Sequence, residues 1–155
     1  MATADPHDLE RFVQAQERVF DAALDEIRAG CKRSHWMWYV FPQIAGLGFS
    51  PTSVRYSIHS RDEAEAYLRH PVLGPRLLEC AEALLRLEGH SAREILGSPD
   101  DLKLRSCATL FAAVSPAGSV FGRLLDRFFG GVPDERTLQL LGDDPGNAEG
   151  SRPRT

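Results

Sequence analysis

Residues 107–114 read CATLFAAV, a run that is apolar almost all the way round a helix. Such a helix is usually central and buried in its domain, because it has no face to turn toward water. The residues that precede this run are polar, namely Asp100, Asp101, Lys103, Arg105 and Ser106. We therefore expect one helix from Ser98 to about Val114, whose first half is polar and whose second half lies in the core.

The N-terminal part of the chain predicts a long amphipathic helix over residues 8–29. Its apolar residues recur at three- and four-residue spacing, which places them on one helical face, and Arg11 falls on the opposite, polar face. Asp8 can cap the first turn. Gly30 can adopt the left-handed conformation in which many helices end.

Serine residues mark the starts of further helices, either before a proline or three residues before a glutamate. These pairs are Ser50-Pro51, Ser98-Pro99, Ser60 with Glu63, and Ser91 with Glu94. The apolar run at 35–41 is too short for its pattern to separate a strand from a helix. We favour a short helix there that ends near Pro42.

The chain shows no alternating pattern typical of strands, no internal repeat and no long interior linker. The sequence therefore predicts an all-α fold, a single compact orthogonal helical domain of about six to eight helices. This domain covers residues 8–142. It follows a flexible N-terminus at 1–7 and precedes a disordered tail at 143–155 that is rich in Gly, Pro and charge.

Composition excludes several classes of protein. The 155 residues include 18 basic and 22 acidic ones, a net charge of −4, so we expect no nucleic-acid partner. No run of about 18 apolar residues exists, so we expect no membrane partner either. Without an export signal or a C-x-x-C pair among its three cysteines, the chain is predicted to be cytoplasmic with reduced thiols. Of its basic residues, 16 are arginines and only two are lysines, Lys32 and Lys103.

Motifs for phosphate loops, dinucleotides and metals are missing from the sequence. Gly46-Leu47-Gly48 begins like a dinucleotide fingerprint, but Pro51 stands where the third glycine would be. The five histidines show no i, i+3 or i+4 pairing that would aim two rings at one ion. The sequence therefore predicts neither a metal nor a cofactor.

The segment 32–43 combines cations, aromatic rings and an amide. These residues are Lys32, Arg33, His35, Trp36, Trp38, Tyr39 and Gln43. Aromatic rings can stack on a planar ligand while neighbouring cations bind its negative charge. The alternative is a core anchor, in which the tryptophans are buried for packing and the cations lie past the end of a helix.

A second polar cluster occupies the first half of the predicted central helix. Asp101, Arg105 and Thr109 are four residues apart and share one helical face, whereas Lys103 and Ser106 lie on another. Cations that lead into a buried helix need partners, because an unpaired buried charge is costly. Either Asp101 and Arg105 form an internal ion pair, or the cations point into a cleft that takes an anionic ligand.

The segment from Lys32 to Gln43 resembles the hallmark of the bacterial domain-of-unknown-function family eighteen-ten, whose members are sometimes labelled calpastatin. Further blocks resemble the same family: Tyr56-Ser57-Ile58, His70 to Gly74, Gly97 to Ser106, Thr109-Leu110-Phe111 and Phe128 to Gly131. The resemblance covers about residues 7–141. It implies a small, mainly helical domain with no established activity, and it favours one pocket shared by the two polar clusters.

Together the clusters predict a pocket for a small anionic or nucleotide-like ligand. Its candidate binding residues are Lys32, Arg33, His35, Trp36, Gln43, Asp100, Lys103, Arg105 and Ser106. His35 is the best candidate for an acid–base group, since histidine titrates nearest neutrality. Whether the protein is an enzyme stays open at this point.

The alternative function is that of a non-enzymatic protein-interaction or regulatory protein. It requires exposed apolar surface, which we expect around Phe128-Phe129 or Trp36-Trp38. For the oligomeric state, the sequence favours a monomer.

Overall fold

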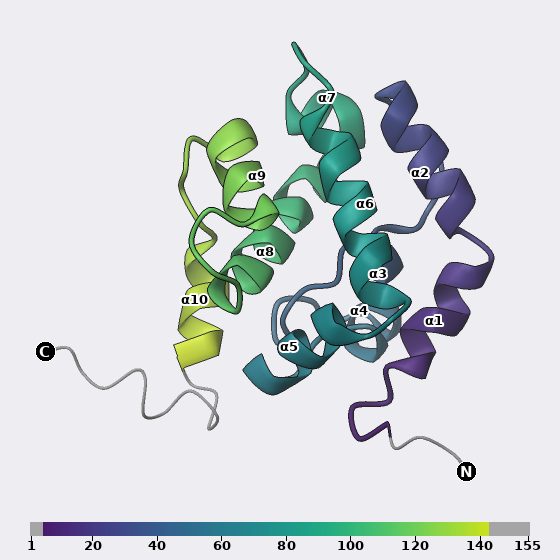
Figure 1. Cartoon of the computed structure of the whole chain (residues 1–155), viewed down its shortest axis with the longest axis vertical. Coiled ribbons are helices and arrows are strands. Elements are labelled where there is room, and N and C mark those ends of the chain that lie inside the picture. The colour runs from purple at the N-terminus through teal and green to yellow at the C-terminus, as the bar shows by residue number, and fades with distance from the viewer. Residues whose placement is uncertain (1–4, 143–155) are drawn as a thin grey trace, which may run out of the picture.

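The computed structural model describes residues 5–142, and within this range the chain is helical without β-strands (Figure 1). The helices are α1 (Glu10–Glu17), α2 (Phe20–Ala29), α3 (Met37–Val40), α4 (Pro51–Arg55), α5 (Arg61–Arg69), α6 (Leu73–Leu85), α7 (Ala92–Leu96), α8 (Asp100–Ala113), α9 (Val120–Phe129) and α10 (Glu135–Gly142). An isolated parallel bridge joins Ile44 to Ile58. The all-α class predicted from the sequence is confirmed.

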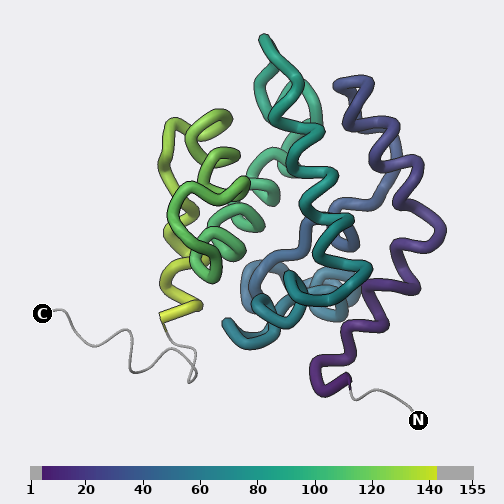
Figure 2. Tube along the Cα trace, viewed as in Figure 1, coloured from purple at the N-terminus to yellow at the C-terminus, as the bar shows by residue number. Residues whose placement is uncertain are grey.

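The described residues form ten helices, so the predicted number of six to eight was too low. The pattern over 8–29 is divided between α1 and α2, with the break at Arg18 and Val19, where the Cα trace changes course (Figure 2). The two halves contact different partners, since α1 packs against α3 and α2 packs against α6. Helices α3, α4 and α7 are four or five residues long, which is too short for periodicity to detect.

The first turn of α1 is capped by Asp5, and the prediction of Asp8 was wrong. The Asp5 carboxylate accepts hydrogen bonds from the backbone N–H groups of Leu9 at 2.8 Å and Glu10 at 3.0 Å. Asp8 instead takes a left-handed conformation with φ 52°, which aspartate tolerates better than most residues. At the other end, Gly30 closes α2 with φ 77°, as predicted.

Serine caps begin three helices in the way the sequence predicts. The side chains of Ser50, Ser60 and Ser91 each accept a hydrogen bond from the backbone N–H three residues further on. Ser98 is the exception, because α8 starts at Asp100 and has no side-chain cap. The short helix favoured for residues 35–41 is present as α3.

The core surrounds α6 and α8. Helix α6 packs against α2 and α9, and α8 packs against α7, α9 and α10, so elements from both ends of the described chain meet there (Figure 1). In α8, Leu104 and every residue from Ser106 to Phe111 are buried, as expected of a central helix. Gly74 brings α6 close to α5, since a Cβ at this position would lie 2.2 Å from the Leu68 carbonyl oxygen.

Within residues 5–142, none of the helices has the length and apolar character needed to cross a membrane. Residues 1–4 of the predicted flexible N-terminus and the whole predicted tail at 143–155 lie outside the described residues.

Candidate functional site

The two polar clusters of the sequence meet at Asp100, the first residue of α8. The Nζ atom of Lys32 lies 2.9 Å from Asp100 Oδ2, and Nζ of Lys103 lies 3.1 Å from Asp100 Oδ1. Lys32 arrives from the loop after α2, where its backbone N–H donates to the Ile95 carbonyl oxygen at 2.7 Å. Both lysines of the chain therefore bind one carboxylate.

Each lysine of this cluster also lies over a tryptophan ring. Lys32 Nζ is 5.1 Å from the centre of the Trp36 ring, and Lys103 Nζ is 4.1 Å from that of Trp38. Burial alone would raise the pKa of Asp100, but the hydrogen bonds and charges of Lys32 and Lys103 outweigh it and lower the pKa. Two ammonium groups against one carboxylate leave the cluster with a surplus of one positive charge.

The loop that carries Lys32 is held by Glu26, near the end of α2. Its Oε1 accepts from the backbone N–H groups of Arg33 at 2.8 Å and Ser34 at 3.0 Å, and from the Trp36 indole N–H at 2.8 Å. Its Oε2 accepts from the Ser34 hydroxyl at 2.6 Å. Burial raises the pKa of Glu26, but these bonds prevail and lower it to about 2. Glu26 thus orients the segment that presents the first cluster.

A cavity of about 280 Å³ opens beside Lys103, and we call it the Lys103 cavity. It is lined by Trp38, Gln43, Leu47, Gly48, Pro99, Leu102, Lys103 and Ser106. The segment after α2 and the first half of α8 therefore share one cavity, which presents a cation, an amide, a hydroxyl and an indole.

The polar groups that line the Lys103 cavity differ in whether they already form hydrogen bonds within the protein. The Ser106 hydroxyl donates to the Leu102 carbonyl oxygen at 3.2 Å. Gln43 is 6% exposed, and within residues 5–142 its amide nitrogen is buried without a hydrogen-bond partner. An unpaired buried donor of this kind is costly.

A second, much smaller cavity adjoins the first and also touches Gln43. It holds about 10 Å³, which is room for at most about one water molecule. Trp38, Leu47 and Gly48 line both cavities, whereas Ser53 and Tyr56 line the small cavity and not the Lys103 cavity. The Gln43 amide therefore lies between a space for water and a space for a ligand.

Of the nine predicted site residues, Gln43, Lys103 and Ser106 line the Lys103 cavity. Lys32, Trp36 and Asp100 do not line it, and the remaining three lie elsewhere. Arg33 is exposed beside the end of α2. His35 is also exposed and lines another open cavity, of about 430 Å³, with Tyr39 and Tyr56. Arg105 donates from Nε to the Val132 carbonyl oxygen at 2.9 Å.

Two of the earlier interpretations change as a result. The predicted internal ion pair between Asp101 and Arg105 is wrong: within residues 5–142, Asp101 Oδ1 is buried without a hydrogen-bond partner, and Arg105 Nε donates to the Val132 carbonyl oxygen. Trp36 is 1% exposed and its indole N–H is bound to Glu26, so it cannot stack on a ligand. Of the two tryptophans, only Trp38 reaches the Lys103 cavity.

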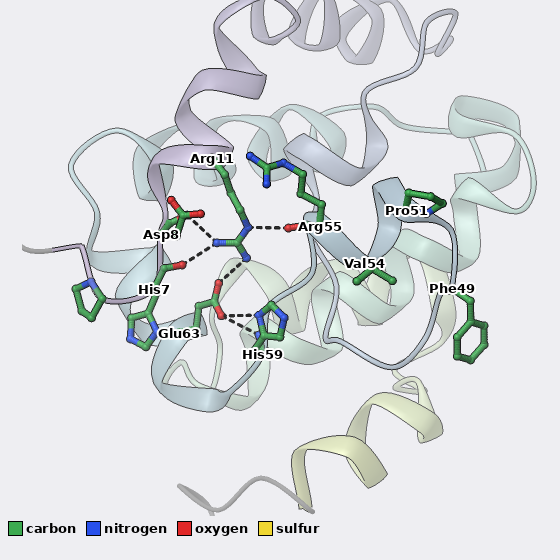
Figure 3. Close-up of a pocket in the computed structure, with 10 residues that line it drawn as sticks. His7, Asp8, Arg11, Phe49, Pro51, Val54, Arg55, His59 and Glu63 are labelled. Carbon is green, nitrogen blue, oxygen red and sulfur yellow. Dashed lines mark hydrogen bonds and ion pairs between the residues drawn. The ribbon is translucent and has the colours of Figure 1, made fainter.

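The sequence interpretation missed a larger cavity, of about 790 Å³, which we call the His59 cavity (Figure 3). It is lined by Pro6, His7, Asp8, Arg11, Phe49, Pro51, Val54, Arg55, His59 and Glu63. Its inner wall is the buried ion pair between Arg11 Nη2 and Glu63 Oε2, at 2.9 Å.

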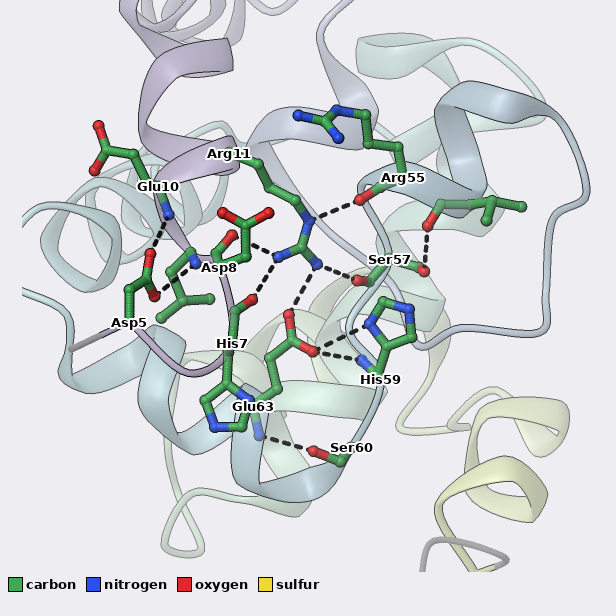
Figure 4. Close-up of polar contacts among 12 residues, drawn as sticks. Asp5, His7, Asp8, Glu10, Arg11, Arg55, Ser57, His59, Ser60 and Glu63 are labelled. Carbon is green, nitrogen blue, oxygen red and sulfur yellow. Dashed lines mark hydrogen bonds and ion pairs between the residues drawn. The ribbon is translucent and has the colours of Figure 1, made fainter.

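The guanidinium group of Arg11 forms all of its hydrogen bonds within the protein (Figure 4). Its Nε donates to the Arg55 carbonyl oxygen, Nη1 donates to the carbonyl oxygens of His7 and Asp8, and Nη2 donates to the Ser57 carbonyl oxygen, each at 2.7 Å. With Glu63 as the fifth acceptor, every N–H of the guanidinium is paired. The periodicity of residues 8–29 predicts Arg11 on an exposed polar face, but the residue is buried, so this prediction was wrong.

Comparison with known proteins gives the class of the molecule, a small helical domain, and then its family. The chain matches the family described as "Protein of unknown function (DUF1810)" over residues 6–141, and it belongs to this family. It is similar to the conserved hypothetical protein Rv1873 from Mycobacterium tuberculosis, whose crystal structure superposes with a TM-score of 0.87. The two share 54% sequence identity, over 89% of this chain and 99% of that one. Among curated proteins, none matches significantly.

Proposed function

We propose that the protein binds a small organic anion in the Lys103 cavity. The observation that carries this proposal is the convergence of Lys32 and Lys103 on Asp100, which leaves one positive charge unbalanced beside the cavity. Side chains in this cluster are only 9–22% exposed, so water compensates the surplus charge incompletely. An anion in the cavity would balance it.

The choice of lysine supports the proposal. The chain uses arginine for 16 of its 18 basic residues, and its two lysines both lie in this cluster. Lysine presents a compact charge with three donors, whereas arginine presents a planar fork. Lys103 pairs with Asp100 and lies over the Trp38 ring, and within residues 5–142 its ammonium group has no other carboxylate partner.

The lining of the cavity indicates the class of ligand. Leu47 and Leu102 provide apolar walls, Trp38 provides an aromatic one, and Gln43 adds an amide side chain whose nitrogen is buried. A cavity of about 280 Å³ lies at the small end of ligand sites, so it suits a ring with one acidic group. A carboxylate and a phosphate share the required chemistry.

Thermal unfolding in the presence of benzoate, ribose 5-phosphate or AMP tests the proposal. A probe at about 100 times its Kd stabilises the fold by roughly 2.7 kcal/mol, which is about 5–10 °C for a domain of this size. We expect such a shift with at least one of these probes and its loss in Lys103→Met.

The matched control is Arg123→Met, which removes the same charge from the surface of α9, where Arg123 pairs with Glu82 at 3.4 Å. This variant should keep the full shift. The proposal is overturned if all three probes leave the midpoint unchanged, or if folded Lys103→Met shifts as much as the unmodified protein.

The alternative of a protein-interaction module has less support from the surface. Trp36 is buried, and Phe128 and Phe129 are half-buried against the core, so the apolar patches expected there are small. The most exposed large apolar residue among those described is Phe49, at the rim of the His59 cavity. We therefore rank the anion site first, and we assign the protein to the cytoplasm as a monomer as part of the same proposal.

A further inference from the structure

The His59 cavity contains a histidine that a buried carboxylate holds in place (Figure 4). Glu63 Oε1 accepts the backbone N–H of His59 at 2.9 Å and lies 3.2 Å from its ring atom Nδ1. The Glu63 side chain is 3% exposed and its other oxygen is paired with Arg11, so its position is fixed. Glu63 is therefore an acceptor, and the neutral ring carries its proton on Nδ1.

This arrangement leaves the other ring nitrogen available to the cavity. The His59 side chain is 61% exposed, and within residues 5–142 its Nε2 atom has no hydrogen-bond partner. A histidine oriented by a carboxylate through Nδ1, with an unprotonated Nε2 facing a ligand space, is the arrangement that enzymes use for proton transfer.

The remaining lining indicates what could approach His59. The Arg55 guanidinium donates to the Tyr56 hydroxyl at 3.3 Å. Within residues 5–142 it forms no direct ion pair, and the carboxylate that acts on it electrostatically is that of Asp8, on the same cavity. His7 and Asp8 complete the polar side, and Phe49, which is 87% exposed, lies with Val54 on the apolar side (Figure 3). The cavity thus offers a cation for an acidic group and apolar surface for the rest of a ligand.

We propose that the His59 cavity is a second ligand site, for a small organic acid, in which His59 exchanges a proton with the bound molecule. Arg55 binds the acidic group, and Phe49 and Val54 contact the apolar part. A proton on a ligand hydroxyl or amine moves to Nε2, and the resulting imidazolium is stabilised by Glu63 through Nδ1–H. His59 is the catalytic residue of this site, and Glu63 is a positioning residue.

Carboxymethylation of the folded, full-length protein by bromoacetate tests this proposal, with neutral bromoacetamide as the matched reagent. At pH 8, above the ordinary titration range of histidine, peptide mass spectrometry measures the rate at each histidine. His35 and His90 are exposed and have no carboxylate partner among residues 5–142, so they are internal references. We expect His59 to react only at Nε2 and to prefer bromoacetate over bromoacetamide more than the references do, because the Arg55 cation attracts the carboxylate of the reagent.

Two variants separate the contributions. Arg55→Gln should reduce the preference of His59 for bromoacetate to that of His35, while reaction at Nε2 alone persists because Glu63 still holds the ring. Lys103→Met should change neither result, so this site is tested independently of the Lys103 cavity. The proposal is overturned if His59 matches the references in rate and in the nitrogen modified, or if Arg55→Gln leaves the preference unchanged.

Discussion

The two ion clusters of this molecule use charge in opposite ways. Arg11 and Glu63 are 6% and 3% exposed, carry balanced charges and have every guanidinium donor paired. Lys32, Asp100 and Lys103 are 9%, 17% and 22% exposed and keep a surplus positive charge at the rim of a cavity. The first cluster holds segments of the chain together, whereas we propose that the second binds an anion.

The difference shows how to separate a structural ion pair from a binding site. A buried pair is costly to desolvate, so it persists where additional hydrogen bonds satisfy both partners. The lysine cluster differs, because it has more cations than anions and lies beside an unpaired amide and a cavity. Its charges are therefore not all balanced by partners within the described residues. The variants below test whether the two clusters differ in this way.

Arg11→Met should have the largest effect. It leaves the Glu63 carboxylate buried without its cation, and breaking a buried pair in this way costs about 3–5 kcal/mol. Urea unfolding of this variant and of Arg28→Met measures the contrast, since the Arg28–Glu79 pair is about half exposed and should contribute no more than about 1 kcal/mol. Equal losses in the two variants would contradict a structural role for Arg11.

Asp100→Asn should move stability and binding in opposite directions. The loss of charged hydrogen bonds to Lys32 and Lys103 should cost about 1.5–3 kcal/mol in urea unfolding. The same change removes a negative charge beside the cavity, so benzoate should bind more tightly than to the unmodified protein. Calorimetric titration checks the second effect, and weaker binding by the folded variant would contradict the surplus-charge argument.

Glu26→Gln should change how stability responds to acid. The pKa of Glu26 is lowered to about 2 in the folded protein, below that of an ordinary glutamate, so its ionised form stabilises the fold above about pH 4.5. This contribution is lost as the pH falls from about 4.5 toward 2. In thermal melts, the melting temperature of the unmodified protein should exceed that of Glu26→Gln at pH 7, and the two should converge near pH 2. A difference in melting temperature that stays constant with pH would contradict the stabilising role of the Glu26 carboxylate.

Arg105→Ala should have the smallest effect of the series. It removes one hydrogen bond from Nε to the Val132 carbonyl oxygen and leaves the Lys103 cavity unchanged, so we expect a loss of about 1 kcal/mol. Benzoate binding should be unaffected. A large drop in binding without a drop in stability would return Arg105 to the ligand site.

The sequence could predict the features that depend on residues close together in the chain, such as helix faces and helix caps. It placed Lys103 and Ser106 on one face of a helix whose second half is buried, and both line the same cavity in the structure. Cap residues such as Ser60 and Gly30 were also predictable, because their partners lie within a few positions.

Partners far apart in the sequence could not be predicted. Arg11 falls on a polar helix face by periodicity, and its burial depends on distant partners, namely Glu63, 52 positions away, and the carbonyl groups of Arg55 and Ser57. The Ser60–Glu63 spacing predicted a cap, and Ser60 is one, but the Glu63 side chain serves Arg11 and His59. In the same way, nothing in residues 32–43 showed that Trp36 would be fixed by Glu26 and that Trp38 would reach the cavity.

The most direct test of the Lys103 cavity uses the rarity of lysine in this chain. Protein labelled with ¹³C at lysine Cε gives two side-chain signals, from Lys32 and Lys103, and Lys103→Arg assigns them by removing one. We predict that benzoate, ribose 5-phosphate or AMP shifts the Lys103 signal along a saturable curve and moves that of the more buried Lys32 less. If neither signal responds to any of these anions, or both drift linearly as with added salt, the Lys103 cavity is not an anion site.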